Sequence, residues 1–356
     1  AVREDARAPG GVELLVKDLE ILSAALEFPN QKKEHGVYFL LDRRHLWLRS
    51  PRQQAVLNVR SSVERAIADF FDGRGFVRVD APILTPTSPE GTTTLFQTDY
   101  FGEPAFLSQS GQLYMEAAAA AFGKVYCAGP TFRAEKSKTR RHVMEFWMIE
   151  PEVAFLDHEG NISLAEDFVS AIVGAVLARR RAELDVLERD VAALERVKPP
   201  FPRVTYDEAH KLLTAKGCDF PWGEDLGGDE QTALAEEYDT PFFVEKFPVS
   251  AKAFYMKRCE DNARLTYSID VFAPEGYGEI IGGSCREEDL DKLIENVAAH
   301  KLPPEPLEWY LDLRRYGAVP MAGFGLGLGR TVMWICGLKH IREAIPFPRM
   351  LNRFYP

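Results

Sequence analysis

The stretch FRAEKSKTRRHVMEF, residues 132–146, decides how this sequence is interpreted. It sets basic, acidic and aromatic side chains at short fixed spacings, and the residues concerned are Arg133, Glu135, Arg141, His142 and Phe146. An arginine guanidinium is a planar cation that matches phosphate oxygens, and a phenylalanine ring is a flat apolar face on which adenine can stack. An isolated Arg-x-Glu is more often a surface ion pair. Taken together, the side chains favour a nucleoside triphosphate site that is not built on a P-loop.

A second informative stretch is GFGLGLGRTVMWICG, residues 323–337, in which alternating glycines run directly into Arg330. Glycine at every second position removes the side chains from one face of a strand, so a planar ligand can approach the backbone there. A strand packed tightly under a helix would give the same pattern. The glycines alone leave both interpretations open.

A third stretch precedes both of these: VRVDAPILTPTSPEG, residues 77–91, begins as an expected strand that Pro82 ends. In this order the three stretches resemble motifs 1, 2 and 3 of the class II aminoacyl-tRNA synthetases, and their details resemble the aspartyl, asparaginyl and lysyl subgroup. The resemblance covers about residues 51–356, almost the whole chain. It implies an α+β fold, in which helices flank an antiparallel sheet of six or more strands and ATP lies bent over that sheet.

Composition limits the class of protein without identifying it. With 356 residues, 46% hydrophobic and 27% charged, the chain can bury a large core, and we expect one large domain with a small additional part. No apolar run approaches the roughly 18 to 20 residues that cross a bilayer, and the N-terminus does not resemble a signal peptide, so we expect a cytoplasmic protein without a membrane partner. The cysteines are odd in number and form no C-x-x-C pair, which argues against a disulfide framework and a zinc site; they are Cys127, Cys218, Cys259, Cys285 and Cys336.

The charge balance bears on a nucleic acid partner. The net charge is −11, from 43 basic and 54 acidic residues, which as a property of the whole chain argues against such a partner. Binding depends, however, on a local patch that touches phosphates. The cluster Lys136, Lys138, Arg140 and Arg141 lies in the loop of the second motif, where the resemblance implies contact with the acceptor end of a tRNA. A solvated loop is the alternative for the two lysines.

The chain divides into three expected parts. Residues 1–22 contain an alternating strand signal, GGVELLVKDLEIL, that resembles the last strand of the OB-fold anticodon-binding domain of these synthetases. Residues 23–50 are expected to be a linker, and residues 51–356 to form the catalytic domain.

Periodicity and capping signals predict the main helices. An amphipathic helix is expected from Arg52 to about Asp72 and, with the strand before Pro82, it forms the dimer interface in this family, so the resemblance implies a homodimer. Two capping boxes predict the starts of later helices, one with Ser163 and Glu166 that runs to about residue 190, the other with Thr205 and Glu208 that stops at Gly217.

The resemblance assigns roles in ATP binding. Arg133 matches the arginine that bridges the α-phosphate and the carboxylate of the amino acid, and Glu135 matches the residue that reads the adenine amino group. Phe146 falls where the family stacks a ring on adenine, and Arg330 matches the arginine on the opposite face of the base. In-line attack on the α-phosphorus develops negative charge that fixed cations stabilise, so we expect Arg133 and Arg330 to be catalytic.

The remaining phosphate contacts involve a metal ion. Arg141 and His142 fall where the family contacts the β- and γ-phosphates. Three phosphates concentrate charge for which hard cations and carboxylate ligands are suited, so Mg²⁺ is expected. Glu279 aligns with the family's metal carboxylate and counts as the third catalytic residue, and Asp270 is the expected second ligand, although the spacing between them is two residues longer than in the aspartyl enzymes. A surface carboxylate is the alternative for both.

A few positions bear on which amino acid is activated. By resemblance, the α-ammonium group is held by Glu90, Ser110 and Gln112. Arg286 aligns with the arginine that reads the end of the substrate side chain, and Met115 stands where the aspartyl enzymes carry a lysine that faces the substrate carboxylate. Glu150 is placed to accept a hydrogen bond from a carboxamide and would repel aspartate by like charge, unless it only orients Arg286. These positions favour asparagine.

The expected function is therefore ligation of asparagine to tRNA(Asn), with ATP and L-asparagine as substrates, Mg²⁺ as cofactor and a second copy as partner. Three alternatives remain open from sequence: a paralogue that makes asparagine from aspartate through an aspartyl-adenylate, an aspartyl-tRNA synthetase, and a non-catalytic tRNA-binding relative. The complete motif set argues against the last, because degenerate relatives lose such residues.

Overall fold

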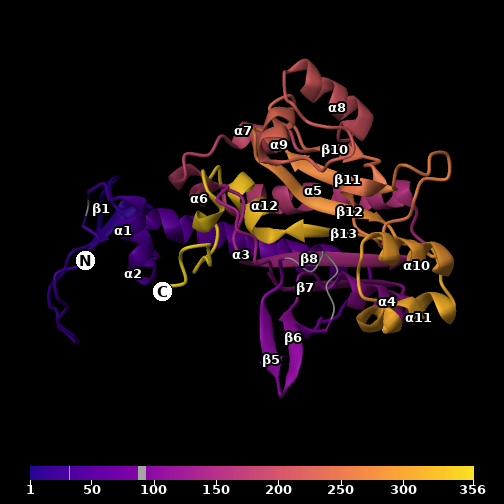
Figure 1. Ribbon diagram of the computed structural model, residues 1–356. Helices are drawn as coiled ribbons and strands as arrows, with labels where there is room; N and C mark the ends of the chain where they lie inside the picture. Colours follow the sequence, from indigo (N-terminus) through magenta and orange to yellow (C-terminus); the bar gives the residue numbers. More distant parts are fainter. Residues whose placement is uncertain (32, 87–93) are drawn as a thin grey trace.

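The computed structural model describes residues 1–31, 33–86 and 94–356. Its centre is one eight-stranded sheet (Figure 1), and the strands in spatial order are β3 (Val77–Arg78), β7 (Lys124–Phe132), β8 (Glu145–Ala154), β13 (Met321–Gly327), β12 (Gly278–Cys285), β11 (Ser268–Ala273), β10 (Phe242–Glu245) and β9 (Arg203–Thr205). Between the two edge strands, each of the six strands from β7 to β10 in this spatial order is antiparallel to its neighbours. The edge strands β3 and β9 pair in parallel with β7 and β10. The predicted α+β fold with an antiparallel sheet is confirmed.

One face of the sheet is covered by three helices, α3 (Pro51–Asp72), α5 (His158–Arg179) and α12 (Leu328–Ile335), whose apolar side chains join the strands in the main core. The ring of Phe71 on α3 lies 4.6 Å from that of Tyr126 on β7 and 4.7 Å from that of Phe168 on α5. The bounds of α3 confirm the helix predicted from Arg52 to Asp72, and Ser50 caps it by accepting the N–H of Gln53. Since side chains alternate along strands, the opposite face of the sheet is left for a site.

The start of α5 differs from the prediction. The helix begins at His158, because the side chain of Asp157 accepts the N–H of Gly160 at 2.8 Å and so caps the helix six residues before Ser163. The expected partner in the capping box, Glu166, instead accepts the N–H of Phe201 at 2.6 Å. The helix also ends at Arg179, and the expected continuation to residue 190 is broken into the short helix α6 (Arg181–Val186).

Among the described residues, α5 is the one helix long and apolar enough to cross a membrane by length and composition. No apolar segment of that length was expected from the sequence. Its apolar residues Phe168, Val169 and Ile172 are buried in the core cluster, so its composition is that of a helix packed on a sheet.

Smaller elements surround the sheet. They are β4 (Leu84–Thr85), β5 (Gln97–Tyr100), β6 (Glu103–Leu107), α4 (Gln112–Phe122), α7 (Val191–Glu195), α8 (Tyr206–Ala215), α9 (Gly228–Ala235), α10 (Leu290–Ala299) and α11 (Glu308–Arg315). The β5–β6 hairpin projects from the body of the molecule, as Figure 1 shows. The capping box of Thr205 and Glu208 is present at the start of α8, as predicted, and Gly217 follows the helix with a φ of +84°.

The N-terminal segment contains a small antiparallel pair, β1 (Val2–Glu4) and β2 (Val12–Leu14), and two short helices, α1 (Val37–Asp42) and α2 (Arg44–Trp47). The two helices lie within the expected linker. Arg44 is buried and donates to the carbonyls of Ile345 and Pro346 at 2.8 Å each and to Gln53 at 2.7 Å. The second half of the linker is therefore fastened to the body of the protein.

Candidate active site

Two adjoining cavities lie on the face of the sheet that the core helices leave open. Cavity A, of about 110 Å³, is lined by residues from the β7–β8 loop, β12, β13 and the start of α12. Cavity B, of about 210 Å³, is lined from β8, β11, β12, the start of α4 and the segment 251–256. The residues shared by both linings are Arg133, Met148, Glu279 and Gly325. A ligand could therefore extend from one cavity into the other.

The glycines of β13 serve both of the purposes considered from sequence. A Cβ on Gly323 would collide with the backbone of Pro151 and with the side chain of Glu152, so this glycine allows β13 and β8 to pack closely. Gly325 and Gly327, in contrast, line cavity A. Gly323 is therefore explained by close strand packing. Gly325 and Gly327 remain candidates for the close approach of a planar ligand.

Cavity A gathers every nucleotide-binding residue that was predicted from sequence. They are Arg133, Glu135, Arg141, His142, Phe146, Glu279 and Arg330. The β7–β8 pairing brings them together, because Phe132 lies opposite Glu145 at the end of the two strands and the loop between them carries most of the set. The guanidinium of Arg133 lies 5.7 Å from the centre of the Phe146 ring, so a cation and an aromatic face are placed together.

Arg330, near the start of α12, also lines cavity A. One of its N–H groups donates to the carboxylate of Glu279 at 3.3 Å and to the backbone carbonyl of Glu279 at 3.2 Å, and another lies 3.4 Å from Nε2 of His142. Burial, and next the charge of Arg330, lower the pKa of His142. A neutral imidazole fits these contacts, with Nε2 accepting from Arg330 and Nδ1–H donating to Thr139.

Arg141 lines cavity A, but its guanidinium is engaged by the protein. It donates to Thr232 at 2.7 Å, to the carbonyl of Gly228 at 3.1 Å and to the carbonyl of Gly276. Burial lowers its pKa to about 10, which still leaves it charged at neutral pH. In this conformation Arg141 ties the β7–β8 loop to α9, and its contact with a phosphate stays a prediction.

Cavity B contains four of the five predicted amino-acid-binding residues, namely Ser110, Gln112, Glu150 and Arg286. Glu150 accepts the backbone N–H of Gly111 at 2.8 Å and the hydroxyl of Ser110, which fixes its carboxylate at the wall of the cavity. The fifth, Glu90, lies outside the described residues. Met115 does not line the cavity; it is fully buried in a small apolar cluster with Ala119 and Val125.

Arg286 has a partner that sequence analysis missed. Its Nε donates to Glu152 at 3.1 Å, a second N–H of its guanidinium donates to the same carboxylate, and a third donates to Ser284 at 2.8 Å. Both residues are buried, and burial raises the pKa of Glu152 while Arg286 opposes that shift. A paired arginine of this kind keeps one orientation, which suits recognition of a planar group.

The expected metal ligands converge although their spacing is unusual. The turn 274–277 joins β11 to β12, and a bulge in β12 turns Glu279 to the same face as Asp270. A Cβ on Gly282 would lie 3.1 Å from a Glu279 oxygen and 3.5 Å from an Asp270 oxygen, so the two carboxylates lie on either side of this glycine and a side chain there would crowd them. This pair of hard oxygen ligands fits Mg²⁺.

Lys252 is a second residue that sequence analysis missed. Its ammonium is buried and lies 2.7 Å from the carboxylate of Asp270 and 3.4 Å from that of Asp225. Burial raises the pKa of Asp270, and Lys252 opposes the shift. No motif surrounds Lys252 in the sequence, and only the fold brings it to cavity B.

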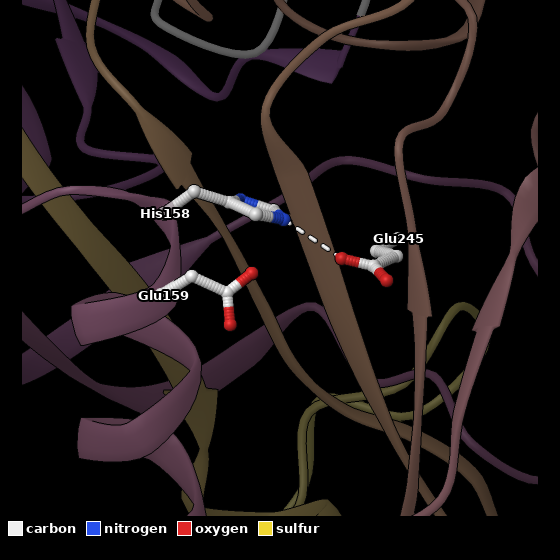
Figure 2. A group of neighbouring side chains, drawn as sticks. All are labelled: His158, Glu159 and Glu245. Carbon is white, nitrogen blue, oxygen red and sulfur yellow. Dashed lines mark hydrogen bonds and ion pairs between the residues drawn. The ribbon is translucent and has the colours of Figure 1, made fainter.

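Another polar cluster, drawn in Figure 2, contributes no residue to either cavity. The ligand atoms of His158, Glu159 and Glu245 lie within 4.8 Å of one another, and among the described residues no other such group of three was found. Arg203, however, donates to both oxygens of Glu159 at 2.7 and 2.8 Å and to Glu245 at 2.9 Å. Arg203 holds both carboxylates at 2.7 to 2.9 Å, and no member of the cluster lines cavity A or cavity B, so we assign the cluster a structural role.

Comparisons with known proteins agree with this geometry. The model of the family tRNA synthetases class II (D, K and N) matches residues 36–351, and the chain belongs to this family. It is 59% identical to the asparagine–tRNA ligase of Sorangium cellulosum and 58% identical to that of Desulforamulus reducens; all of this chain and 82% and 83% of those proteins are covered. It also resembles the crystal structure of asparaginyl-tRNA synthetase from Pyrococcus horikoshii complexed with asparaginyl-adenylate, with 46% identity, a TM-score of 0.97 and coverage of 100% of this chain and 82% of that one. The family predicted from the three motifs is confirmed.

Proposed function

We propose that this protein is an ATP-dependent ligase that joins L-asparagine to the AMP part of ATP, releasing pyrophosphate and forming asparaginyl-adenylate, and then transfers asparagine from the adenylate to the 3′ end of tRNA(Asn), which releases AMP. The observation that carries this proposal is the pairing of a fixed donor, Arg286, with a fixed acceptor, Glu150, in the cavity next to the one that gathers the nucleotide-binding residues. The relatives described above are named asparagine–tRNA ligases, which supports the same choice.

Adenylate formation is an in-line attack of the asparagine carboxylate on the α-phosphorus of ATP. Arg133 lines both cavities, so its guanidinium can hold that carboxylate and the α-phosphate in one geometry. Phe146 stacks on adenine, Glu135 accepts from the adenine amino group, and Arg330 covers the other face of the base. Charge that develops on the phosphate oxygens meets cations that are already in place.

Mg²⁺ belongs to this proposal through Glu279 and Asp270. When bound, the ion neutralises phosphate charge that the arginines leave uncompensated. Glu279 also anchors Arg330 through the 3.3 Å ion pair, so one carboxylate links the metal site to the base-covering arginine.

Selection of asparagine follows from the two ends of a carboxamide. Arg286 donates to its oxygen and Glu150 accepts from its NH₂ group. Ser110, Gln112 and Glu90 hold the α-ammonium group. Aspartate presents a second carboxylate to Glu150, and the like charges repel one another.

We further propose that two copies associate around α3 and Pro82. Exposed apolar side chains gather near this surface, namely Val77, Ile83, Leu84, Trp147 and Phe347. A cavity of about 620 Å³ between α3, β7, β8 and residues 345–347 includes Trp147 in its wall, and a smaller neighbouring cavity joins Trp147 to Pro82 and Ile83. Apolar surface of this kind is typical of protein interfaces. Light scattering after size-exclusion chromatography tests this, with a mass twice that of the chain as the expected result.

The remaining assignments follow the domain division. Residues 1–22 are the end of an OB-fold, residues 23–50 are a connector, and residues 51–356 are the catalytic domain of a cytoplasmic enzyme. The side chains of Lys136, Lys138 and Arg140 are exposed on the β7–β8 loop, where they can contact the phosphates of the tRNA acceptor end.

The activity is tested by pyrophosphate exchange with ATP and either amino acid, followed by charging of tRNA. Exchange that requires asparagine, with charging of tRNA(Asn), is the expected result. Exchange with aspartate and no charging would instead indicate a paralogue that makes asparagine from aspartate. Exchange and charging with aspartate would indicate an aspartyl-tRNA synthetase.

A further inference from the structure

The carboxylate of Glu116, on α4, is fully buried behind cavity B without lining it. Three side chains donate to it: Arg314 at 2.7 Å, Gln112 at 3.1 Å, and the hydroxyl of Tyr310 at 2.8 and 2.9 Å from its two oxygens. A buried carboxylate is costly unless it is paired and hydrogen-bonded, and Glu116 meets both conditions. Such a well-satisfied group has one defined position.

The support comes from the side away from the cavity. Tyr310 and Arg314 lie one turn apart on α11, and Arg314 also donates to the backbone carbonyl of Glu287 at 2.9 Å. Tyr310 is buried with Leu113 of α4 in one apolar cluster, so the two helices are packed together. Burial raises the pKa of Tyr310 well above its usual value, and its hydroxyl therefore keeps the proton that it donates.

On the cavity side, Glu116 contacts Gln112, one of the residues expected to hold the α-ammonium group of the substrate. An ionised carboxylate only accepts hydrogen bonds, so it binds the NH₂ end of the Gln112 amide and turns the carbonyl oxygen away from itself. An ammonium group only donates, so it needs that carbonyl oxygen. Without a fixed partner, an amide can present either end to the cavity.

We propose that Glu116, clamped by Tyr310 and Arg314, is a positioning residue that holds the amide of Gln112 with its carbonyl oxygen toward the α-ammonium group of the amino acid. This inference rests on the proposed function, because it assumes that cavity B takes an amino acid. It assigns α11, which lies outside the three motifs, a part in amino-acid binding.

The effect of Glu116 is confined to one end of the substrate. Arg286 also lies near it, with its Nε 3.9 Å from a Glu116 oxygen, but that guanidinium has its own shorter bonds to Glu152 and Ser284. Arg286, the residue proposed to bind the carboxamide, is therefore held in place by Glu152 and Ser284. Loss of Glu116 weakens recognition of the ammonium group and leaves recognition of the carboxamide in place.

The test compares asparagine with succinamate, which is asparagine without its α-ammonium group. In pyrophosphate exchange by the full chain, Glu116→Gln is expected to raise the KM for asparagine about tenfold, the size of effect for one hydrogen bond to a charged group. The KM for ATP and the inhibition constant of succinamate, measured as a competitor of asparagine in the same exchange assay, stay unchanged. A purely structural role would instead shift all three together.

Glu308→Gln is the matched control, because it makes the same chemical change on α11 at an exposed carboxylate that pairs with Arg315. If Glu116→Gln fails to fold, as judged by circular dichroism, the double variant Glu116→Gln/Arg314→Met replaces it, since it leaves no unpaired buried charge, and the same split in constants is expected. An unchanged KM for asparagine, or an equal loss of succinamate binding, would overturn the inference. A wild-type protein that exchanges with neither amino acid would overturn the proposed function instead.

Discussion

The ammonium of Lys252 lies 2.7 Å from the carboxylate of Asp270, at the place where a second metal ligand was expected. Both side chains are buried, and the aliphatic part of the lysine brings its Nζ to 3.8 Å from the centre of the Phe247 ring. The wall of cavity B thus contains a cation of its own. A metal ion at Glu279 and Asp270 would share Asp270 with this lysine.

We expect Lys252→Met to lower the free energy of unfolding by roughly 3 kcal/mol, because it leaves the buried carboxylate of Asp270 without its positively charged partner. Urea unfolding measures this. The matched control is Lys257→Met, whose partner Glu288 lies 2.6 Å away but where both side chains are partly exposed, and which should cost under about 1 kcal/mol. Equal losses for the two variants would contradict the buried pair at Lys252.

Phe146→Ala tests the stacking face of cavity A. Base stacking on an aromatic side chain contributes about 1 to 3 kcal/mol, so the KM for ATP should rise by roughly tenfold or more while the KM for asparagine changes little. Pyrophosphate exchange at varied ATP concentration gives both constants. Phe155→Ala, at an exposed phenylalanine, is the control, and it should leave both unchanged. If Phe146→Ala bound ATP normally, the Phe146 ring would not stack on adenine.

Arg133→Ala tests the residue that lines both cavities. A preorganised cation beside developing phosphate charge acts on the transition state more than on binding, so kcat should fall by about 100-fold or more. The KM for ATP should change much less than in Phe146→Ala. Single-turnover adenylate formation is the measurement, and equal, mild effects of the two variants would argue against both roles.

Glu245→Gln tests the cluster of His158, Glu245 and Arg203. Burial opposes ionisation of Glu245, but its hydrogen bonds to His158 and Arg203 outweigh it and lower its pKa from 4.5 to about 2. A carboxyl whose pKa is depressed on folding stabilises the protein above its unfolded pKa, and this contribution is lost as the pH falls through the folded value. The variant should therefore be less stable by roughly 3 kcal/mol at pH 7.

The difference should shrink as the pH falls from about 4.5 towards about 2, because both proteins then carry a neutral side chain at this position. Thermal unfolding across that range checks the sign. Glu237→Gln, at a more exposed pair with Lys216, is the control and should show little dependence. A constant gap between wild type and the Glu245 variant at all pH values would mean that the charge is not what stabilises this cluster.

The sequence was most informative where function depends on short spacings. Arg133 and Phe146 sit at the two ends of one hairpin loop, so strand pairing alone brings them together, and both could be found from one stretch. The glycines before Arg330 were found in the same way. Side chains that are far apart in the sequence but bonded in the fold could not be paired from the sequence. Glu152 lies 134 positions from Arg286, and Arg314 lies 198 positions from Glu116.

Local rules also failed where two signals competed. Ser163 with Glu166 matched a capping box, yet Asp157 is a helix cap nearer the preceding strand and starts α5 earlier. Met115 stands where the aspartyl enzymes carry a lysine that faces the substrate, but the methionine side chain packs in the apolar cluster with Ala119 and Val125. A substitution pattern indicates which chemistry is missing, whereas only the packing tells which way the side chain points.

Glu150→Gln tests how the site distinguishes an amide from a carboxylate. The variant keeps a carbonyl oxygen at this position but adds an NH₂ group and removes the negative charge, so it can donate to aspartate where the wild type repels it. We expect kcat/KM for asparagine to fall and that for aspartate to rise, which narrows their ratio by about 100-fold. Pyrophosphate exchange with each amino acid measures the ratio. Glu145→Gln, at an exposed carboxylate at the start of the same strand, is the matched control and should leave it unchanged. If Glu150→Gln lowered both values equally, Glu150 would support the cavity without choosing between the two substrates, and selection would rest on Arg286 and its partner Glu152.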